Sequence, residues 1–283
     1  MDFVAGAQPL SKNEIEKGLQ RLPALSATVT QLLELTQRDD VDVDQVALTV
    51  AQDPALSARL LRVANSPFFG LAGEITSINQ ACMTLGMNTV RNLAVAVGVG
   101  SCFNNDKDGG DEQGRLWRLA MEKAIAAQAL ARCCGHNSET AFTAGMLHDL
   151  GKMVMVTCFS DAMKKTIAYQ SSNGCDLDVA ERAVFGIDNR QLGGMLASNW
   201  GLPALIRQVI TGPNEIEENM PEPMVDIVAL ADLISNGEIH GSPEELYQNL
   251  PEKIVVRLGL DCDSVQAWLS EVEANRAMAD LLA

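Results

Sequence analysis

The sequence predicts an all-α protein, and three observations support this fold class. Apolar residues recur at intervals of three and four residues along almost the whole chain. Alternation of apolar and polar residues is not sustained anywhere for the length of a strand. Residues that begin and end helices bound several of the periodic segments. With 283 residues, of which 47% are hydrophobic, the chain can build one large domain or two modest ones.

The first helix with clear ends covers residues 55–64. Asp53 suits the N-cap position and Pro54 the first turn, where a missing N–H is not needed. The apolar residues of this segment fall on one helical face. Asn65, Ser66 and Pro67 then end the helix.

Two further helix starts carry the pattern of a capping box. Ser77 and Gln80 precede an apolar helical segment that ends before Gly86, and another helix follows. Asp178 and Glu181 show the same spacing later in the chain. We therefore expect Glu181 at a helix N-terminus.

The middle of the chain contains a polar, glycine-rich segment at 104–114, which predicts a linker between two subdomains. An alanine-rich helix is expected over 116–134, and the next helix ends near His148. Residues 213–223, with three prolines and four glutamates, predict an exposed acidic connector. The last helix is expected to end near Leu282.

Composition excludes several classes of function. A net charge of −16 argues against nucleic acid as a partner, because binding to phosphate backbones needs clustered Lys and Arg. Seven cysteines without metal-ligand spacing, and an N-terminus without a basic region before an apolar stretch, indicate reduced thiols and a cytoplasmic location. The longest apolar run is far below the roughly 20 residues of a membrane span, so no membrane association is expected.

The most informative motif is the adjacent pair His148 and Asp149, in a chain with only three histidines. An imidazole and a carboxylate at the end of an apolar helix can bind one divalent ion. Asp232 lies in an apolar run, where a carboxylate needs a partner or a metal. Lys152 follows Asp149 at helical contact spacing and suits an ion pair with it. The alternative is a structural pair, with His148 hydrogen-bonded in the core.

Several motifs together resemble the HDOD domain of bacterial signalling proteins. They are LPAL at 22–25, QDPALSARLLRVANSPFFG at 52–70, ITSI at 75–78, AGMLHDLGK at 144–152 and WGLP at 200–203. The resemblance covers roughly 20–215. It implies a two-lobed helical fold in which an N-terminal helical lobe packs on a lobe related to the HD and HD-GYP metal-dependent phosphohydrolases. We accordingly expect an N-terminal extension at 1–20, the first lobe at 21–104 and the HD-like lobe with C-terminal helices at 115–283.

The resemblance also implies where the hydrolases place further metal ligands. An earlier histidine is expected at the position of Leu119, another near Asn189, and a histidine pair at Thr211 and Gly212. None of these four residues replaces an imidazole. The candidate metal ligands are therefore His148, Asp149 and Asp232, with Lys152 as a neighbour. His136 and His240 lie in loop segments and do not complete the set.

These observations favour a regulatory signalling module that is a pseudoenzyme and acts as a scaffold for other signalling proteins. A hydrolytic site needs at least three protein ligands and an open position for water, and three is the minimum available here. No cofactor and no catalytic residue are then expected. The alternative is an HD-type phosphohydrolase, similar to a phosphodiesterase, with a reduced site for Mn, Mg, Fe or Zn. A nucleotide or other anion bound near His148 without turnover is a third possibility.

Overall fold

The computed structural model describes residues 9–35, 41–66, 69–71, 73–103, 110–212, 222–237 and 241–275. Every regular element in these ranges is helical, which confirms the predicted all-α class. The helices, in chain order, are α1 (Lys12–Leu19), α2 (Ala27–Leu35), α3 (Val43–Ala51), α4 (Pro54–Ala64), α5 (Ile78–Leu85), α6 (Met87–Ser101), α7 (Gly110–Cys133), α8 (Ser138–Leu147), α9 (Leu150–Cys158), α10 (Ser160–Asn173), α11 (Leu177–Phe185), α12 (Asn189–Asn199), α13 (Ala204–Thr211), α14 (Pro223–Ser235), α15 (Pro243–Asn249), α16 (Glu252–Leu258) and α17 (Cys262–Asn275).

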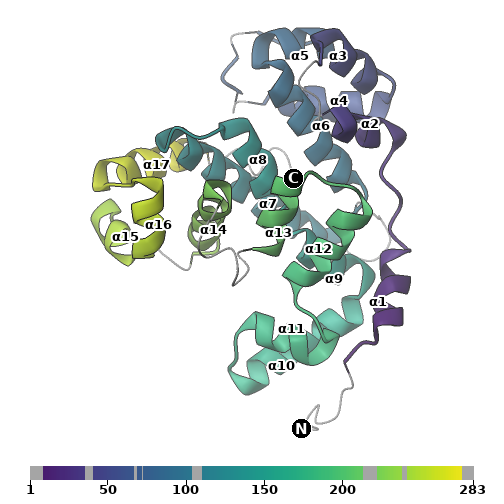
Figure 1. Ribbon diagram of the computed structural model, residues 1–283, viewed down its shortest axis with the longest axis vertical. Coiled ribbons are helices and arrows are strands. Elements are labelled where there is room, and N and C mark those ends of the chain that lie inside the picture. Colours follow the sequence, from purple (N-terminus) through teal and green to yellow (C-terminus); the bar gives the residue numbers. More distant parts are fainter. Residues whose placement is uncertain are drawn as a thin grey trace.

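The helices form a central group with three groups around it (Figure 1). Helices α2 to α6 lie together at one end, and α6 packs on α8 of the central group. The centre is built from α7, α8, α9, α12, α13 and α14, while α10 and α11 lie at the opposite end. Helices α15 to α17 project to one side, with α17 against α7. One hydrophobic core runs through these groups, so the site described below rests on a continuous packed interior.

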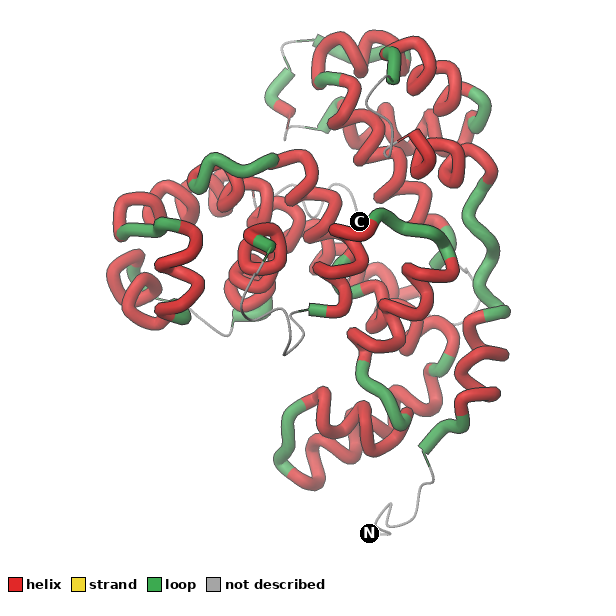
Figure 2. The backbone as a smooth tube through the Cα atoms, viewed as in Figure 1, coloured by secondary structure: helices red, strands yellow, loops and turns green. Residues whose placement is uncertain are grey.

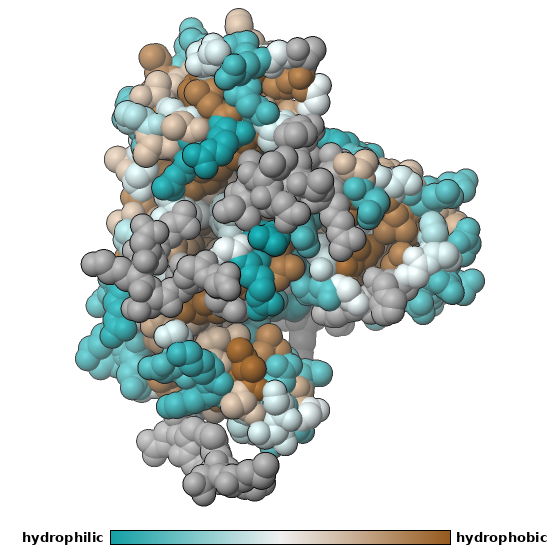
Figure 3. All heavy atoms as spheres, turned by 180° about the vertical axis from the view of Figure 1, so that it is seen from behind, coloured by the Kyte–Doolittle hydropathy of each residue, from teal (hydrophilic) through white to brown (hydrophobic). Residues whose placement is uncertain are grey.

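Short loops connect most of the helices (Figure 2). None of the described helices is both long and apolar enough to cross a membrane. The face shown in Figure 3 is a mosaic of hydrophilic and hydrophobic residues over its visible part. Such mixing is normal for an exposed protein surface.

The first helix, α1, packs against the second half of the chain rather than against α2. Gly18 faces the ring of Phe159 so closely that an added Cβ would lie 2.8 Å from a ring carbon. The amide of Leu10 donates a hydrogen bond to the carbonyl oxygen of Val184, 3.1 Å away. The predicted extension at 1–20 therefore contains a packed helix that contacts α9.

The predicted helix starts are confirmed at Asp53 and partly confirmed at Ser77. The Asp53 carboxylate accepts from the amide of Leu56 at 2.9 Å, with Pro54 in the first turn. Ser77 caps α5, but the side chain of Gln80 accepts from Thr76 instead of completing a capping box.

The capping box predicted from Asp178 and Glu181 is wrong. Helix α11 begins after Asp176, so Asp178 lies inside its first turn. Glu181 points into the interior, where it accepts from the backbone and side-chain amides of Asn189, at 2.8 Å each. Glu181 is the fifth residue of α11, too far along the helix to cap it, and its carboxylate accepts from the free amide at the start of α12 instead.

The predicted linker at 104–114 is too long at its C-terminal end, since α7 already begins at Gly110. Residues 104–109 and most of the predicted connector at 213–223 lie outside the described residues, as does the predicted end of the last helix.

Glycine at position 151 sets the distance between α9 and α12, and we predict that Gly151→Ala destabilises the protein. An added Cβ would overlap the carbonyl oxygen of Asn189 and lie 2.9 Å from the amide nitrogen of Gly193. Both are backbone atoms, so the helices must separate, at a cost of about 1–3 kcal/mol or more. Urea unfolding of Gly114→Ala is the matched control, because nothing lies within 4 Å of that helical glycine. An equal stability of both variants would contradict this prediction.

Candidate functional site

The break between α8 and α9 positions His148 and Asp149 at the centre of the molecule. His148 follows the last residue of α8, and Asp149 precedes the first residue of α9. Helix α8 approaches α7 closely at Gly145, where an added Cβ would lie 3.0 Å from the carbonyl oxygen of Lys123. A glycine there lets the two backbones meet, which brings the pair against α7.

The two ring nitrogens of His148 both face oxygen atoms. Nδ1 lies 2.8 Å from the carbonyl oxygen of Gly145, and Nε2 lies 3.1 Å from Oδ1 of Asp232 on α14. A carbonyl oxygen and a carboxylate only accept, so each contact is a hydrogen bond when its ring nitrogen carries the proton. The same Asp232 oxygen also accepts from Nδ2 of Asn236 at 3.0 Å. The structure thus brings together the three predicted residues His148, Asp149 and Asp232.

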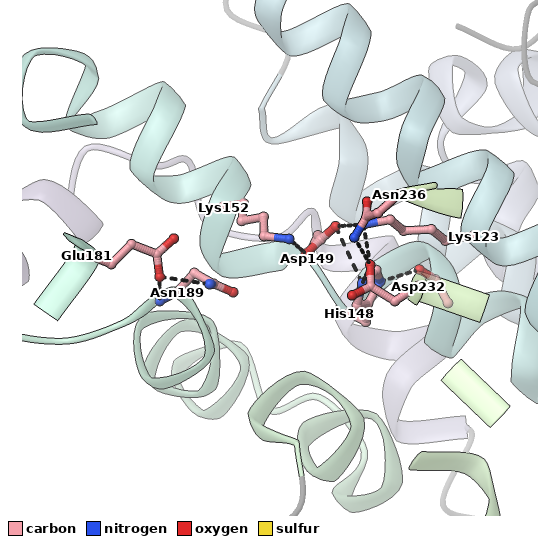
Figure 4. A network of polar contacts seen from close by, with 9 residues as sticks. Lys123, His148, Asp149, Lys152, Glu181, Asn189, Asp232 and Asn236 are labelled. Atoms are coloured by element: carbon pink, nitrogen blue, oxygen red, sulfur yellow. Dashed lines mark hydrogen bonds and ion pairs between the residues drawn. The ribbon is translucent and has the colours of Figure 1, made fainter. Parts of the chain in front are cut away.

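A residue that the sequence did not single out, Lys123, completes this cluster. Its side chain comes from α7 and is 1% exposed. Its Nζ bonds to Oδ2 of Asp149 and lies 2.6 Å from Oδ1 of Asp232 (Figure 4). Lysine is almost never fully buried unless it is paired, and here it has two carboxylate partners. We refer to Lys123, His148, Asp149 and Asp232 as the central cluster.

Lys152 extends the central cluster toward the surface. Its Nζ lies 2.8 Å from Oδ1 of Asp149, at the predicted spacing of three residues. Burial acts to lower the pKa of Lys152, but Asp149 outweighs it, so the pKa is raised above the usual value. Lys152 is therefore a charged partner of Asp149.

The positive neighbours keep both carboxylates ionised. Burial acts to raise the pKa of Asp149, but His148, Lys123 and Lys152 together hold it well below the usual range. Burial also acts to raise the pKa of Asp232, where hydrogen bonding and charge from His148 and Lys123 again prevail and lower it. Both carboxylates are thus charged at neutral pH.

Glu181 forms a separate buried acidic site beside the central cluster. Figure 4 shows its carboxylate turned to Asn189 at the start of α12. Its side chain is 0% exposed, and Oε1 has no hydrogen-bond partner among the described residues. Burial raises the pKa of Glu181, and the hydrogen bonds from Asn189 only partly offset this.

Glu181→Gln should therefore become more favourable relative to wild type as the pH rises. A carboxyl group whose pKa is raised by folding favours the folded state below its unfolded pKa, about 4.3, and loses that contribution as pH rises through the folded value. The gain in free energy of unfolding should grow between pH 4 and pH 7 in urea titrations. Glu16→Gln, at an exposed site, serves as the control. A difference that does not change with pH would contradict the prediction.

A groove of about 750 Å³ opens over the central cluster. Its wall includes His148, Asp149, Lys152 and Asp232, so the cluster reaches the solvent-facing side of α9 and α14. Three arginines also line it: Arg115, Arg182 and Arg190. Of these, Arg182 is engaged by Asp178 and Asp188, at 2.5 and 2.9 Å. The groove can admit a ligand of small-molecule size, by volume.

None of the four residues at the other expected ligand positions serves as a metal ligand. Leu119 is a half-buried side chain of α7, and Asn189 is bonded to Glu181. The Thr211 hydroxyl donates within its own helix, to the carbonyl oxygen of Arg207 at 3.0 Å. Gly212 has no side chain. Of the remaining histidines, His136 lies exposed after α7, and His240 falls outside the described residues.

A divalent ion does not fit the central cluster as it is arranged. One ligand atom each from His148, Asp149 and Asp232 lies within 4.8 Å of the others, which is close enough for shared coordination. A metal at these oxygens would need distances of about 2.0–2.2 Å. The ammonium of Lys123 already contacts the same two carboxylate oxygens. Nε2 of His148 is likewise already in contact with Oδ1 of Asp232, at 3.1 Å.

Comparison with protein families places most of the chain in one family. Residues 22–216 match the profile of the HDOD domain. Among curated proteins, one from Treponema pallidum named "Uncharacterized protein" is 24% identical over 220 residues, which is 75% of this chain and 42% of that protein. The cyclic di-GMP phosphodiesterase CdgJ of Vibrio cholerae is 30% identical over 126 residues, 44% of this chain and 28% of that protein. The chain thus spans less than half the length of these two relatives.

Solved structures with the same fold cover nearly the whole chain. An HDOD domain protein with unknown function from Geobacter sulfurreducens superposes with a TM-score of 0.79 at 24% identity, covering 96% of this chain and 97% of that one. A structure from Shewanella amazonensis named "Putative phosphohydrolase" gives 0.77 at 27% identity, covering 95% and 98%. A structure from Marinobacter aquaeolei named "Putative signal transduction protein" gives 0.71 at 22% identity, covering 96% and 65%.

Proposed function

Because the chain belongs to the HDOD domain family, we propose that it is a signal-transduction module that acts through contacts with other proteins and does not hydrolyse phosphate esters. The name of the Marinobacter relative supports a role in signalling. The names of the Shewanella and Vibrio relatives associate this fold with phosphoester hydrolysis, so the proposal depends on whether the central cluster can support that reaction.

The main support for the proposal is that the carboxylate oxygens of the central cluster are occupied by hydrogen bonds and ion pairs to other side chains. Both oxygens of Asp149 bond to lysines, and Oδ1 of Asp232 accepts from three side chains: Lys123, His148 and Asn236. Metal-dependent hydrolysis needs carboxylates and imidazoles free to coordinate an ion and an open position for water. In this protein the two carboxylates and the imidazole instead form hydrogen bonds and ion pairs within the protein, as in a structural network.

The first experiment measures turnover with the purified full chain. Bis-p-nitrophenyl phosphate and cyclic di-GMP are supplied with Mn²⁺, Mg²⁺, Fe²⁺ or Zn²⁺, and the matched control is Asp149→Asn, which keeps the shape of the side chain. We expect the same background rate for both proteins. A metal-dependent rate that the folded Asp149→Asn variant lacks would overturn the proposal and favour the phosphohydrolase alternative.

A second experiment tests the positive part of the proposal. A partner protein enriched by crosslinking and quantitative pull-down on the wild-type chain should be enriched equally on His148→Gln, once circular dichroism shows that the variant is folded. A scaffold does not need the imidazole as a reactive group, which is the reason for this expectation. No enriched partner, or loss of the partner on folded His148→Gln, would contradict it.

A further inference from the structure

The buried ammonium of Lys123 occupies the middle of the only set of potential metal ligands found among the described residues. Its two acceptors are Oδ2 of Asp149 and Oδ1 of Asp232, and the same two oxygens lie 3.4 and 3.1 Å from Nε2 of His148. The Lys123 ammonium therefore contacts the same carboxylate oxygens that a bound metal ion would share with His148. Figure 4 shows these side chains converging from α7, the α8–α9 junction and α14.

The two carboxylates are matched by two ammonium groups, which together carry the same charge as a divalent ion. Asp149 and Asp232 bring two negative charges, and the ammonium groups of Lys123 and Lys152 bring two positive ones. Asp149 is buried and Asp232 half-buried, and two carboxylates this close repel each other and need cations between or beside them. Lys123 meets that need for both carboxylates, and Lys152 adds a second contact to Asp149 from the groove side.

The position of Lys123 on its helix is consistent with this role. Leu119, which stands where the related hydrolases are expected to carry a histidine ligand, precedes Lys123 by four residues on α7. Residues four apart lie on the same side of a helix, one turn from each other. The side of α7 that would supply a ligand in a metal site supplies a cation in this protein.

We infer that Lys123 is a built-in substitute for the metal ion, and that its ammonium excludes divalent cations from a ligand set that is otherwise able to bind them. Removing the ammonium leaves His148, Asp149 and Asp232 without their central cation. These residues then form a three-ligand site for a divalent transition metal such as Mn²⁺ or Zn²⁺. The inference concerns binding and does not depend on whether the protein signals through partners.

Mn²⁺ binding to the full chain tests this inference, measured by equilibrium dialysis and by loss of the free-ion signal in electron paramagnetic resonance. Wild type should show no saturable site. Lys123→Ala should bind one Mn²⁺ per chain, and the double variant Lys123→Ala with Asp232→Asn should lose that site. Lys152→Met is the matched control, because it removes the other ammonium but leaves Lys123 in place and should bind no Mn²⁺.

Two outcomes would overturn the inference directly. One is a wild-type site for one Mn²⁺ that disappears in His148→Gln, and the other is a folded Lys123→Ala variant that binds no metal. If Lys123→Ala does not fold, the inference is tested in the wild-type protein by the ¹⁵N NMR signal of the Lys123 ammonium. It should persist unbroadened in excess Mn²⁺, and strong paramagnetic broadening would show that the ion enters the cluster.

Discussion

Asp149→Ala should lower the free energy of unfolding by about 3–5 kcal/mol, because it leaves Lys123 with one carboxylate and removes the ion-pair partner of Lys152. Removing one partner of a buried ion pair costs far more than the pair contributes, since a charge then stays buried without compensation. Urea unfolding monitored by circular dichroism measures the effect. Asp161→Ala is the matched control, because its pair with Lys164 is exposed on both sides.

The same carboxylates should make the wild-type protein acid-sensitive. Folding lowers the pKa of Asp149 and of Asp232, so their contribution to stability is fully present above the unfolded value of about 3.9 and falls as the pH drops below it. Asp149→Asn should therefore show a weaker dependence of stability on pH below about 4. For the alanine variants, free energies of unfolding of Asp149→Ala and Asp161→Ala that differ by less than about 1 kcal/mol would contradict the role assigned to the central cluster.

Trp268→Ala should have an effect of similar size, about 3–5 kcal/mol, because it empties a large volume of fully buried core. The side chain is 0% exposed in α17 and packs where this helix meets α7. Its Nε1 donates a hydrogen bond to the carbonyl oxygen of Ala126, 2.8 Å away. The indole therefore stabilises the packing of α17 against α7.

Trp268→Phe separates the two contributions of the indole. It keeps most of the apolar volume and removes the hydrogen bond, so we expect a loss of about 1 kcal/mol, with part of the ring volume adding to it. Thermal and urea unfolding of both variants measure this. An alanine variant as stable as wild type would show that α15 to α17 unfold independently of the core.

The fold class could be predicted because helical periodicity and end signals are local properties of the sequence. Asp53 and Pro54 mark the start of α4 within a few residues, and the structure confirms it. Asp178 and Glu181 show the limit of such signals. The spacing fits a capping box, but whether Glu181 caps its own helix or another depends on packing between α11 and α12, which no local pattern records.

The sequence also predicted only part of the central cluster, because the missing residue is placed by packing and not by a local pattern. The adjacent His148 and Asp149, the isolated Asp232 and the spacing of Lys152 all stand out in the sequence. Lys123 was missed because a single lysine in an alanine-rich helix is usually exposed. One signal was available: residues 124 to 131 are apolar on almost every side, with Gln128 the exception, so a cation just before them has little surface to reach.

The path of α1 bears on where this chain can be divided. The residues that match the family, 22–216, exclude α1, which covers Phe159, and also exclude Asp232 and Trp268. A protein cut to those limits would expose one aromatic ring, lose half of the carboxylate charge around Lys123 and lose the indole that is hydrogen-bonded to α7. The segment defined by sequence similarity is thus smaller than the packed unit in the structure, and experiments on this protein should use the chain from α1 through α17.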